Sequence, residues 1–179
     1  MTGNILKKMK AQAAMEYLMT YGWALLVIVI VIAILVSLNL FSAPQGCSFE
    51  RVGFTCGAPL IDTAGNLFLP LTNGNPNNIK LVGVVCTADK TPNAPEAPSS
   101  GHGYFANMTM LKQSTYDLGN TTATQPICTK VDGITPFETN PGADFSGKIW
   151  VFYHNEEDGD NYPLRTVSAN LVTKTVKAS

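Results

Sequence analysis

The sequence contains little charge, and one long stretch contains none. Charged residues make up 14% of the 179 residues, which is a small share for a soluble globular protein. The net charge is −1, so no basic surface points to a nucleic-acid partner. Lys, Arg, Asp and Glu are all absent between Glu16 and Glu50. This distribution divides the chain into a basic leader over residues 1–11, an apolar segment over 12–42 and a mildly acidic polar domain over 43–179.

Signatures of catalysis are also missing. The sequence contains no Gly-x-Ser-x-Gly elbow, no phosphate-binding P-loop and no His-Glu-x-x-His motif. Its two histidines, His102 and His154, form no recognisable triad with the many Ser and Thr hydroxyls. An enzymatic function is therefore disfavoured, and no cofactor is expected.

The most prominent feature that is present is an apolar run. Residues 25–36 read LLVIVIVIAILV, and apolar character extends over 17–41. At ~1.5 Å per residue, a helix of this length exceeds the ~30 Å hydrocarbon core of a bilayer. A lone strand would leave its amides unpaired in lipid, so the run predicts a helix. Tyr17, Tyr21 and Trp23 lie at its leader end, as interfacial aromatic residues do, and the lysines before them favour a cytoplasmic leader and an external C-terminal domain.

Three interpretations of this N-terminus compete. A cleaved secretory signal is one, because Phe-Ser-Ala at 41–43 resembles a cleavage site, although the run is longer than a typical signal core. A permanent signal anchor is the second. Neither accounts for Glu16, a carboxylate at the edge of the apolar run. The third interpretation starts from that residue.

Gln12, Glu16 and Tyr17, followed by LMTYGWALLVIVIVIAILV, resemble the leader of archaeal type IV pilin-like proteins, which carry a class III signal peptide. The resemblance covers about the first forty residues. It implies that a prepilin peptidase cuts between Ala11 and Gln12, so that Glu16 becomes the fifth residue of the mature chain. The family often has glycine where Ala11 stands, and both residues are small.

The resemblance implies a structural subunit of a surface filament. Its partners would be identical subunits in a helical homopolymer, the prepilin peptidase, a membrane platform with an assembly ATPase, and membrane lipid before assembly. A buried carboxylate is costly unless it is paired, so Glu16 is expected to meet the new α-amine of Gln12 in its own or a neighbouring chain, and Tyr17 lies beside it. Alternatively, Glu16 is solvated at headgroup depth. The alternative function is a membrane-anchored binding protein or adhesin, including a minor pilin, that does not form the filament body.

The segment after residue 42 predicts a β-rich domain. Short apolar runs alternate with clusters of Gly, Pro, Asn and Thr, which is typical of an antiparallel sandwich-like domain. Together with the N-terminal helix, this gives an α+β class. The expected strands are residues 49–55, 66–72, 80–87, 108–112, 127–131, 148–154 and 164–176. The strand at 148–154 has two apolar faces and is expected to be central, whereas the Pro-rich segment 88–103 predicts an exposed loop.

Four cysteines, Cys47, Cys56, Cys86 and Cys128, lie in this domain. An even number beyond a membrane anchor indicates two disulfides, for which three connectivities exist. The favoured one is Cys47–Cys56 with Cys86–Cys128, which closes a short loop and ties distant strands. A metal site is the alternative, but the spacings contain no Cys-x-x-Cys pair and no nearby histidine.

Two further motifs concern the surface of the domain. Asn107-Met-Thr and Asn120-Thr-Thr are N-glycosylation sequons in polar stretches. Residues 155–161, NEEDGDN, gather four acids around a glycine. They predict a solvated turn between two strands, with a calcium site as the alternative.

Overall fold

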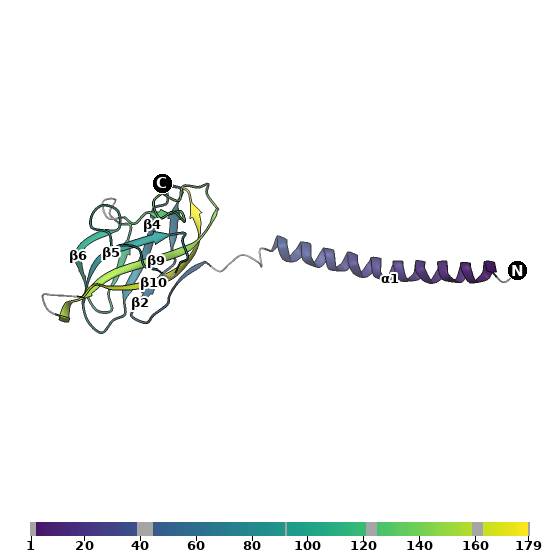
Figure 1. Cartoon of the computed structure of the whole chain (residues 1–179), viewed down its shortest axis with the longest axis horizontal. Coiled ribbons are helices and arrows are strands. Elements are labelled where there is room, and N and C mark those ends of the chain that lie inside the picture. Colours follow the sequence, from purple (N-terminus) through teal and green to yellow (C-terminus); the bar gives the residue numbers. More distant parts are fainter. Residues whose placement is uncertain (1–2, 39–44, 92, 121–124, 159–162, 179) are drawn as a thin grey trace. The chain divides into compact units, whose positions relative to one another are not determined.

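The computed structural model describes residues 3–38, 45–91, 93–120, 125–158 and 163–178, with side chains from Met15 onward. The chain divides into two compact units, Met1–Ala43 and Pro44–Ser179 (Figure 1). Among the described residues, the first unit contains one helix and the second is built mainly from strands.

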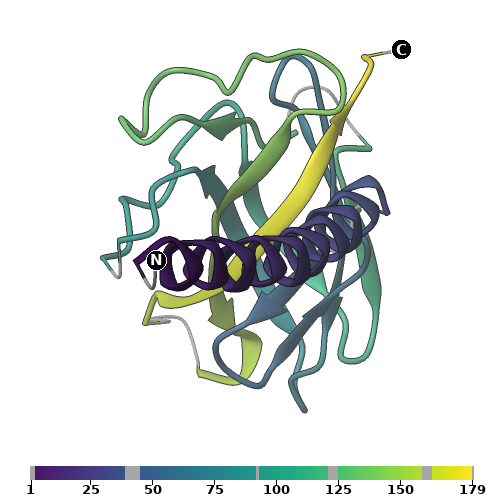
Figure 2. The same cartoon turned by 90° about the vertical axis from the view of Figure 1, so that its right-hand side faces the viewer.

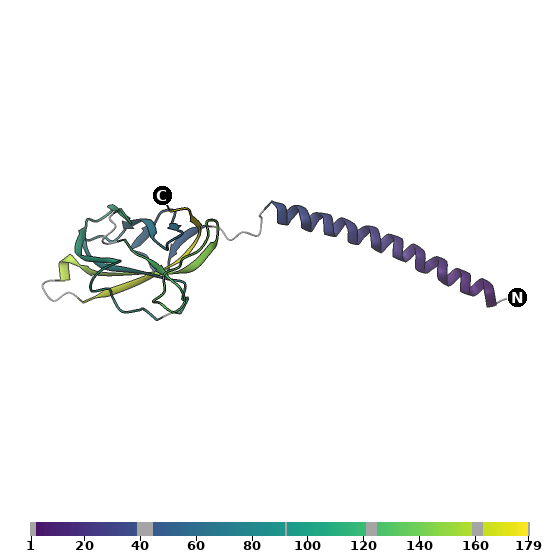
Figure 3. The same ribbon diagram turned by 90° about the horizontal axis from the view of Figure 1, so that it is seen from above.

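The helix α1 (Gly3–Ser37) is continuous over 35 residues (Figure 3). No proline interrupts this segment, and an α-helix satisfies its backbone hydrogen bonds within itself. At its C-terminal end, the Leu38 amide and the Ser37 hydroxyl both donate to the carbonyl of Ile34, at 3.0 and 2.8 Å. Helix α1 is thus a local structure that needs no other part of the chain to form its ladder.

The described residues of the second unit form ten strands and one short 3-10 helix. They are β1 (Gly46–Phe49), β2 (Phe54–Cys56), β3 (Leu60–Asp62), β4 (Leu67–Asn73), β5 (Ile79–Thr87), β6 (Tyr104–Met110), β7 (Thr115–Leu118), β8 (Cys128–Thr129), β9 (Asp144–Asn155), η1 (Glu156–Asp158) and β10 (Arg165–Val176).

The strands form one mixed sheet in the order β2-β4-β3-β10-β9-β5-β6, with β1 added to β10, β7 to β4 and β8 to β5. The two longest strands, β9 and β10, run antiparallel over ten residue pairs, and Figure 2 shows β10, in yellow, beside the green β9. Most pairings are antiparallel, but β10–β3 and β5–β8 are parallel. The α+β class is confirmed, whereas the two parallel pairings were not predicted.

Buried and exposed side chains alternate along the strands, and the buried ones show where the core lies. In β4, Leu67, Leu69 and Leu71 are buried, whereas Phe68 between them is exposed. These leucines belong to the same buried cluster as Ile149 and Val151 of β9, so strands that are not neighbours in the sheet order contribute to one core. The predicted central position of β9 is confirmed, because β10 and β5 flank it.

The expected strand at 49–55 is wrong. Strand β1 ends at Phe49, and β2 begins at Phe54, with a turn between them in which Gly53 has φ +125°. The two short strands then pair with different partners, β1 with β10 and β2 with β4. The apolar residues on both sides of the turn made the segment read as one strand, but it is a corner that joins two parts of the sheet.

Other boundaries also differ from the expectation. Strands β3 and β7 were not predicted, and they contain three and four residues. Strand β6 begins at Tyr104 and includes a bulge at Ala106 and Asn107, whereas the sequence predicts a start at residue 108. Strand β8 contains only two residues of the predicted 127–131.

The predicted loop at 88–103 carries no helix or strand among its described residues, but part of it is packed on the sheet. Pro98 lies so close to Gly83 of β5 that a Cβ added to Gly83 would come within 2.3 Å of the Pro98 Cγ. The loop therefore packs against β5 at Gly83, where a residue with a Cβ would leave Pro98 too little room.

Candidate functional site

The apolar side chains of α1 are exposed on every side of the helix. The span Met15–Ser37 contains 23 residues, long and apolar enough to cross a membrane, and none of its most apolar window is buried within the chain. At ~1.5 Å per residue the span measures about 34 Å, against a hydrocarbon core of ~30 Å. Trp23, Ile28 and Ile32 are 72%, 57% and 53% exposed. Such a surface requires lipid, a partner protein or both to cover it.

The predicted assembly residues lie at the first turn of this span. Glu16 is its only charged residue, and its carbonyl accepts a hydrogen bond from the Thr20 hydroxyl at 2.9 Å. The rings of Tyr17 and Tyr21, four residues apart, have centroids 4.3 Å apart. The polar and aromatic groups are thus gathered at one end, as expected for the boundary of an apolar layer.

The predicted cleavage residues, Ala11 and Gln12, lie within the helical backbone of α1, and their side chains are outside the described part. In this helix the backbone at the predicted cleavage position is engaged in the hydrogen-bonded ladder. A peptidase would therefore need to unwind one turn locally before it could reach the carbonyl.

The structure contains the disulfides Cys47–Cys56 and Cys86–Cys128, which are the two pairings predicted from the sequence. The first joins β1 to β2 with a Cα–Cα distance of 5.9 Å. The second joins β5 to β8, and its cysteines are register partners on the two strands. Cys86 and Cys128 are buried, whereas Cys47 and Cys56 are half-buried, so one bridge belongs to the core and the other to the rim.

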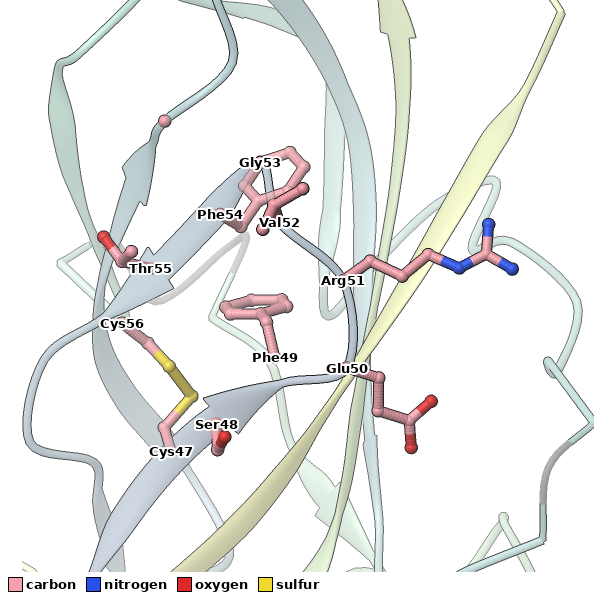
Figure 4. Close-up of a pocket in the computed structure, with 11 residues that line it drawn as sticks. Cys47, Ser48, Phe49, Glu50, Arg51, Val52, Gly53, Phe54, Thr55 and Cys56 are labelled. Carbon is pink, nitrogen blue, oxygen red and sulfur yellow. A yellow bond between two sulfur atoms is a disulfide. The ribbon is translucent and has the colours of Figure 1, made fainter.

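The rim disulfide joins the two arms of the β1–β2 corner, which borders a cavity of about 550 Å³. Figure 4 shows the Phe49 ring between the two strands, the Phe54 ring near Gly53 at the turn, and the disulfide at the end of the corner away from the turn. The ring centroids are 5.7 Å apart, and Phe54 also meets Tyr153 of β9 edge-on at 5.0 Å. These aromatic contacts anchor the β1–β2 corner to the core.

A charged contact also anchors the β1–β2 corner. The Glu50 carboxylate accepts hydrogen bonds from the Lys148 ammonium at 2.8 Å and from the Ser168 hydroxyl at 2.6 Å. Lys148 is only 8% exposed, and its Nζ lies 5.6 Å from the centre of the Trp150 ring. The hydrogen bond from Lys148, followed by that from Ser168, holds the pKa of Glu50 below its ordinary value of 4.5.

The sequence did not predict this ion pair, although it contained a signal. Lys148 stands directly before a continuous apolar run in β9, and a lysine in a buried strand needs a partner. The identity of the partner could not be read from the sequence, because Glu50 is 98 residues away.

Asn73 is a second residue that the sequence did not single out. It is fully buried, and its side-chain amide donates to the carbonyls of Asn77, Met110 and Leu111 at 3.1, 3.3 and 3.2 Å. Its side-chain oxygen accepts a hydrogen bond from the Asn75 amide at 3.0 Å. One amide group therefore holds the β4–β5 and β6–β7 connections together.

The acidic segment 155–161 is described only as far as Asp158, and residues 159–162 lie outside the described part. Glu157 accepts a hydrogen bond from the Asn77 amide at 2.7 Å, and Asp158 pairs with Arg165 at 3.0 Å. Within the described ranges, no three His, Cys, Asp or Glu side chains are grouped so that they could hold a metal ion. The side chains of Glu157 and Asp158 thus make contacts within the protein.

The two predicted glycosylation residues, Asn107 and Asn120, are both exposed. Asn107 lies in the bulge of β6, with Thr109 of its sequon also exposed. Asn120 follows β7 and lines a shallow cavity of about 360 Å³ beside Leu60 and Phe68, and the rest of its sequon falls outside the described residues.

Comparisons of the chain with protein-family models, with curated proteins and with solved structures found no match. The function is therefore inferred from the exposed apolar helix α1, from the disulfide-linked β domain and from the N-terminal motif with Gln12, Glu16 and Tyr17.

Proposed function

We propose that this chain is a structural subunit of a surface filament similar to archaeal type IV pili. One observation carries the proposal: the 23-residue span of α1 is apolar on all sides, and none of its most apolar window is covered by the rest of the chain. The leader motif with Gln12, Glu16 and Tyr17 supports the same assignment. In the membrane the span would lie in lipid, and in the filament the same surface would be covered by the helices of other subunits.

The properties of the second unit agree with an external position. Two disulfides persist in oxidising surroundings, and they support a domain that is exported rather than cytosolic. We also favour a sandwich-like arrangement for this domain, because inward-facing side chains of β4 and of β9 share one core. Such a domain would coat the outside of the filament.

Glu16 would select the axial register of the stacked helices. After cleavage before Gln12, the new α-amine provides a cation within four residues of the Glu16 carboxylate, in the same or a neighbouring chain. An unpaired carboxylate in an apolar layer is costly, so pairing would favour assembled over isolated subunits.

The test is to purify surface filaments and determine the N-terminus of their main protein. Gln12 is expected as the first residue, and a mature protein that starts near Met1 would contradict the proposal. In parallel, Glu16→Ala and Glu16→Gln are expected to reduce the yield of filaments while the protein stays in the membrane fraction. Normal yields from both variants would refute the pairing role.

A membrane-anchored binding protein is the second candidate. Leu60 and Phe68 are cross-strand neighbours that are 46% and 39% exposed and border the 360 Å³ cavity. An exposed apolar surface of this kind suits a binding partner. In this alternative the helix stays in the membrane and no filament contains the protein.

A further inference from the structure

Strand β6 lies at an end of the sheet order and pairs only with β5 among the described strands. The outer edge of a terminal strand presents backbone N–H and C=O groups that can pair with another chain. A protein that is concentrated on a surface, as a filament subunit is, needs a structural feature that prevents such pairing. Two features of β6, a bulge and a glycosylation sequon, coincide in the middle of the strand.

The first feature is a bulge. Leu81 pairs with Met108 and Gly83 pairs with Tyr104, so that residues 105–107 of β6 stand opposite the single residue 82 of β5. Ala106 and Asn107 have φ values of +49° and +57°. The bulge places Phe105 and Met108 on the core side and turns Ala106 and Asn107 outward. Contacts within the protein engage the two ends of β6, because the Tyr104 amide donates to the Gly101 carbonyl at 3.2 Å and the Met110 carbonyl accepts from the Asn73 side chain at 3.3 Å. The bulge interrupts pairing between these ends, and the part of the edge that another chain could approach is the middle of β6, around the bulge.

The second feature is the sequon within the bulge. Asn107 and Thr109 are both exposed, and they lie two residues apart with the core-facing Met108 between them. The amide and the hydroxyl that a glycosyltransferase must read are therefore accessible on the same side of the strand. Asn is favoured at positive φ, so the bulge suits Asn107, and the exposed Thr109 two residues later is the feature that points to glycosylation.

From these two features we infer that Asn107 is an N-glycosylation site whose glycan shields the β6 edge from other chains. The donor is a lipid-linked oligosaccharide. The Asn107 side-chain nitrogen forms a bond to the anomeric carbon, the bond from that carbon to the lipid phosphate breaks, and the lipid phosphate leaves with the electron pair. The amide proton passes to a base of the transferase. A strand that paired with β6 would have to lie about 4.8 Å from it, and sugars attached at the exposed Asn107 would hinder its approach.

The inference rests on the external position of the domain that is part of the proposed function. Asn120 offers a matched comparison, because it is a sequon residue outside the named strands. A glycan there would cover Phe68 and Leu60 rather than the β6 edge.

The test uses the full chain produced in cells that glycosylate a reporter sequon, with peptide mass spectrometry as the readout. Wild-type protein and Thr109→Ser are expected to carry a glycan at Asn107, whereas Thr109→Val is expected to lose it and keep Asn107 in the bulge. Thr109 is exposed, so folding should survive both changes. An unmodified Asn107 in the wild-type protein would overturn the assignment.

The shielding role has its own readout, which is the sedimentation of detergent-solubilised protein. Thr109→Val is expected to shift at least half of the protein into larger, concentration-dependent species, whereas Asn120→Gln is not. Identical sedimentation of a glycosylated wild type and bare Thr109→Val would overturn the shielding role.

Protease added to intact cells separates failure of this inference from failure of the proposed function. A protected domain would refute its external position and the inference together. A cleaved domain with a bare Asn107 would refute the inference alone.

Discussion

Helix α1 and the β domain solve the problem of burial in opposite ways. The helix forms its hydrogen bonds locally and leaves its apolar side chains exposed, so what covers it must come from outside. The domain draws its core from β4, β5, β9 and β10, and two disulfides cross-link its strands. The domain is therefore stabilised by contacts within the chain, whereas burial of the apolar surface of the helix depends on lipid or partner molecules around it. Each of the following experiments perturbs one side of this comparison.

Removing the core disulfide should have the largest effect. Cys86→Ala with Cys128→Ala opens a loop with a sequence separation of 42, and chain entropy predicts a loss of about 4 kcal/mol in the free energy of unfolding. The matched variant without Cys47 and Cys56, which has a separation of 9, should lose about 3 kcal/mol. Denaturant unfolding measures both. An equal or larger loss for the rim disulfide would contradict the assignment of the buried bridge as the main cross-link.

Val29→Lys should weaken membrane insertion of the helix and leave the stability of the domain unchanged. A lysine near the centre of a membrane span costs about 3 kcal/mol of insertion free energy. We expect less protein in carbonate-washed membranes and in filaments, with an unchanged melting temperature of the domain. Val131→Lys is the control, since Val131 is 69% exposed on the domain. Equal amounts of the two variants in membranes and filaments would contradict the claim that the helix, and not the domain, requires an apolar environment.

Gly83→Ala tests the packing of the 88–103 loop. The new Cβ would lie 2.3 Å from the Pro98 Cγ and 3.0 Å from the Gly103 carbonyl oxygen, so the loop must shift. Overpacking of this kind costs about 2 kcal/mol, which should appear as a lower melting temperature. Gly46→Ala is the matched control, because its Cβ would meet no atom within 4 Å. A wild-type melting temperature for Gly83→Ala would show that the loop is not held against β5.

The smallest effect is expected from pH. The pKa of Glu50 is lowered in the folded protein by its hydrogen bonds to Lys148 and Ser168, so the native state binds this proton less readily than the unfolded chain. Its contribution is fully present above the ordinary value of 4.5 and is lost as the pH falls through the lower folded value. Glu50→Gln should flatten this acid limb of the melting temperature between pH 5 and pH 3, roughly the range over which such a carboxylate protonates. Superimposable curves for the variant and the wild type would refute the linkage.

The sequence predicted what depends on composition and on long periodic runs. The apolar run of α1, the central two-faced strand β9 and the number of cysteines were readable, because each is a local pattern with one physical solution. It did not predict the corner between Phe49 and Phe54, because both flanks are apolar and only the sheet assigns them to different partners. The Glu50–Lys148 pair and the Asn73 contacts were also unpredicted, since they join residues far apart in the chain.

The Cys47–Cys56 bridge has a mechanical consequence. Strand β1 is the first strand after the helix, so tension arriving along the chain enters the domain at Gly46 and reaches the disulfide one residue later. When β1 is pulled away from β10, separation cannot continue past Cys47 unless force also acts on Cys56, whose strand β2 is paired with β4. The bridge thus divides a pulling force between two ladders, β1 on β10 and β2 on β4, before either has to carry it alone.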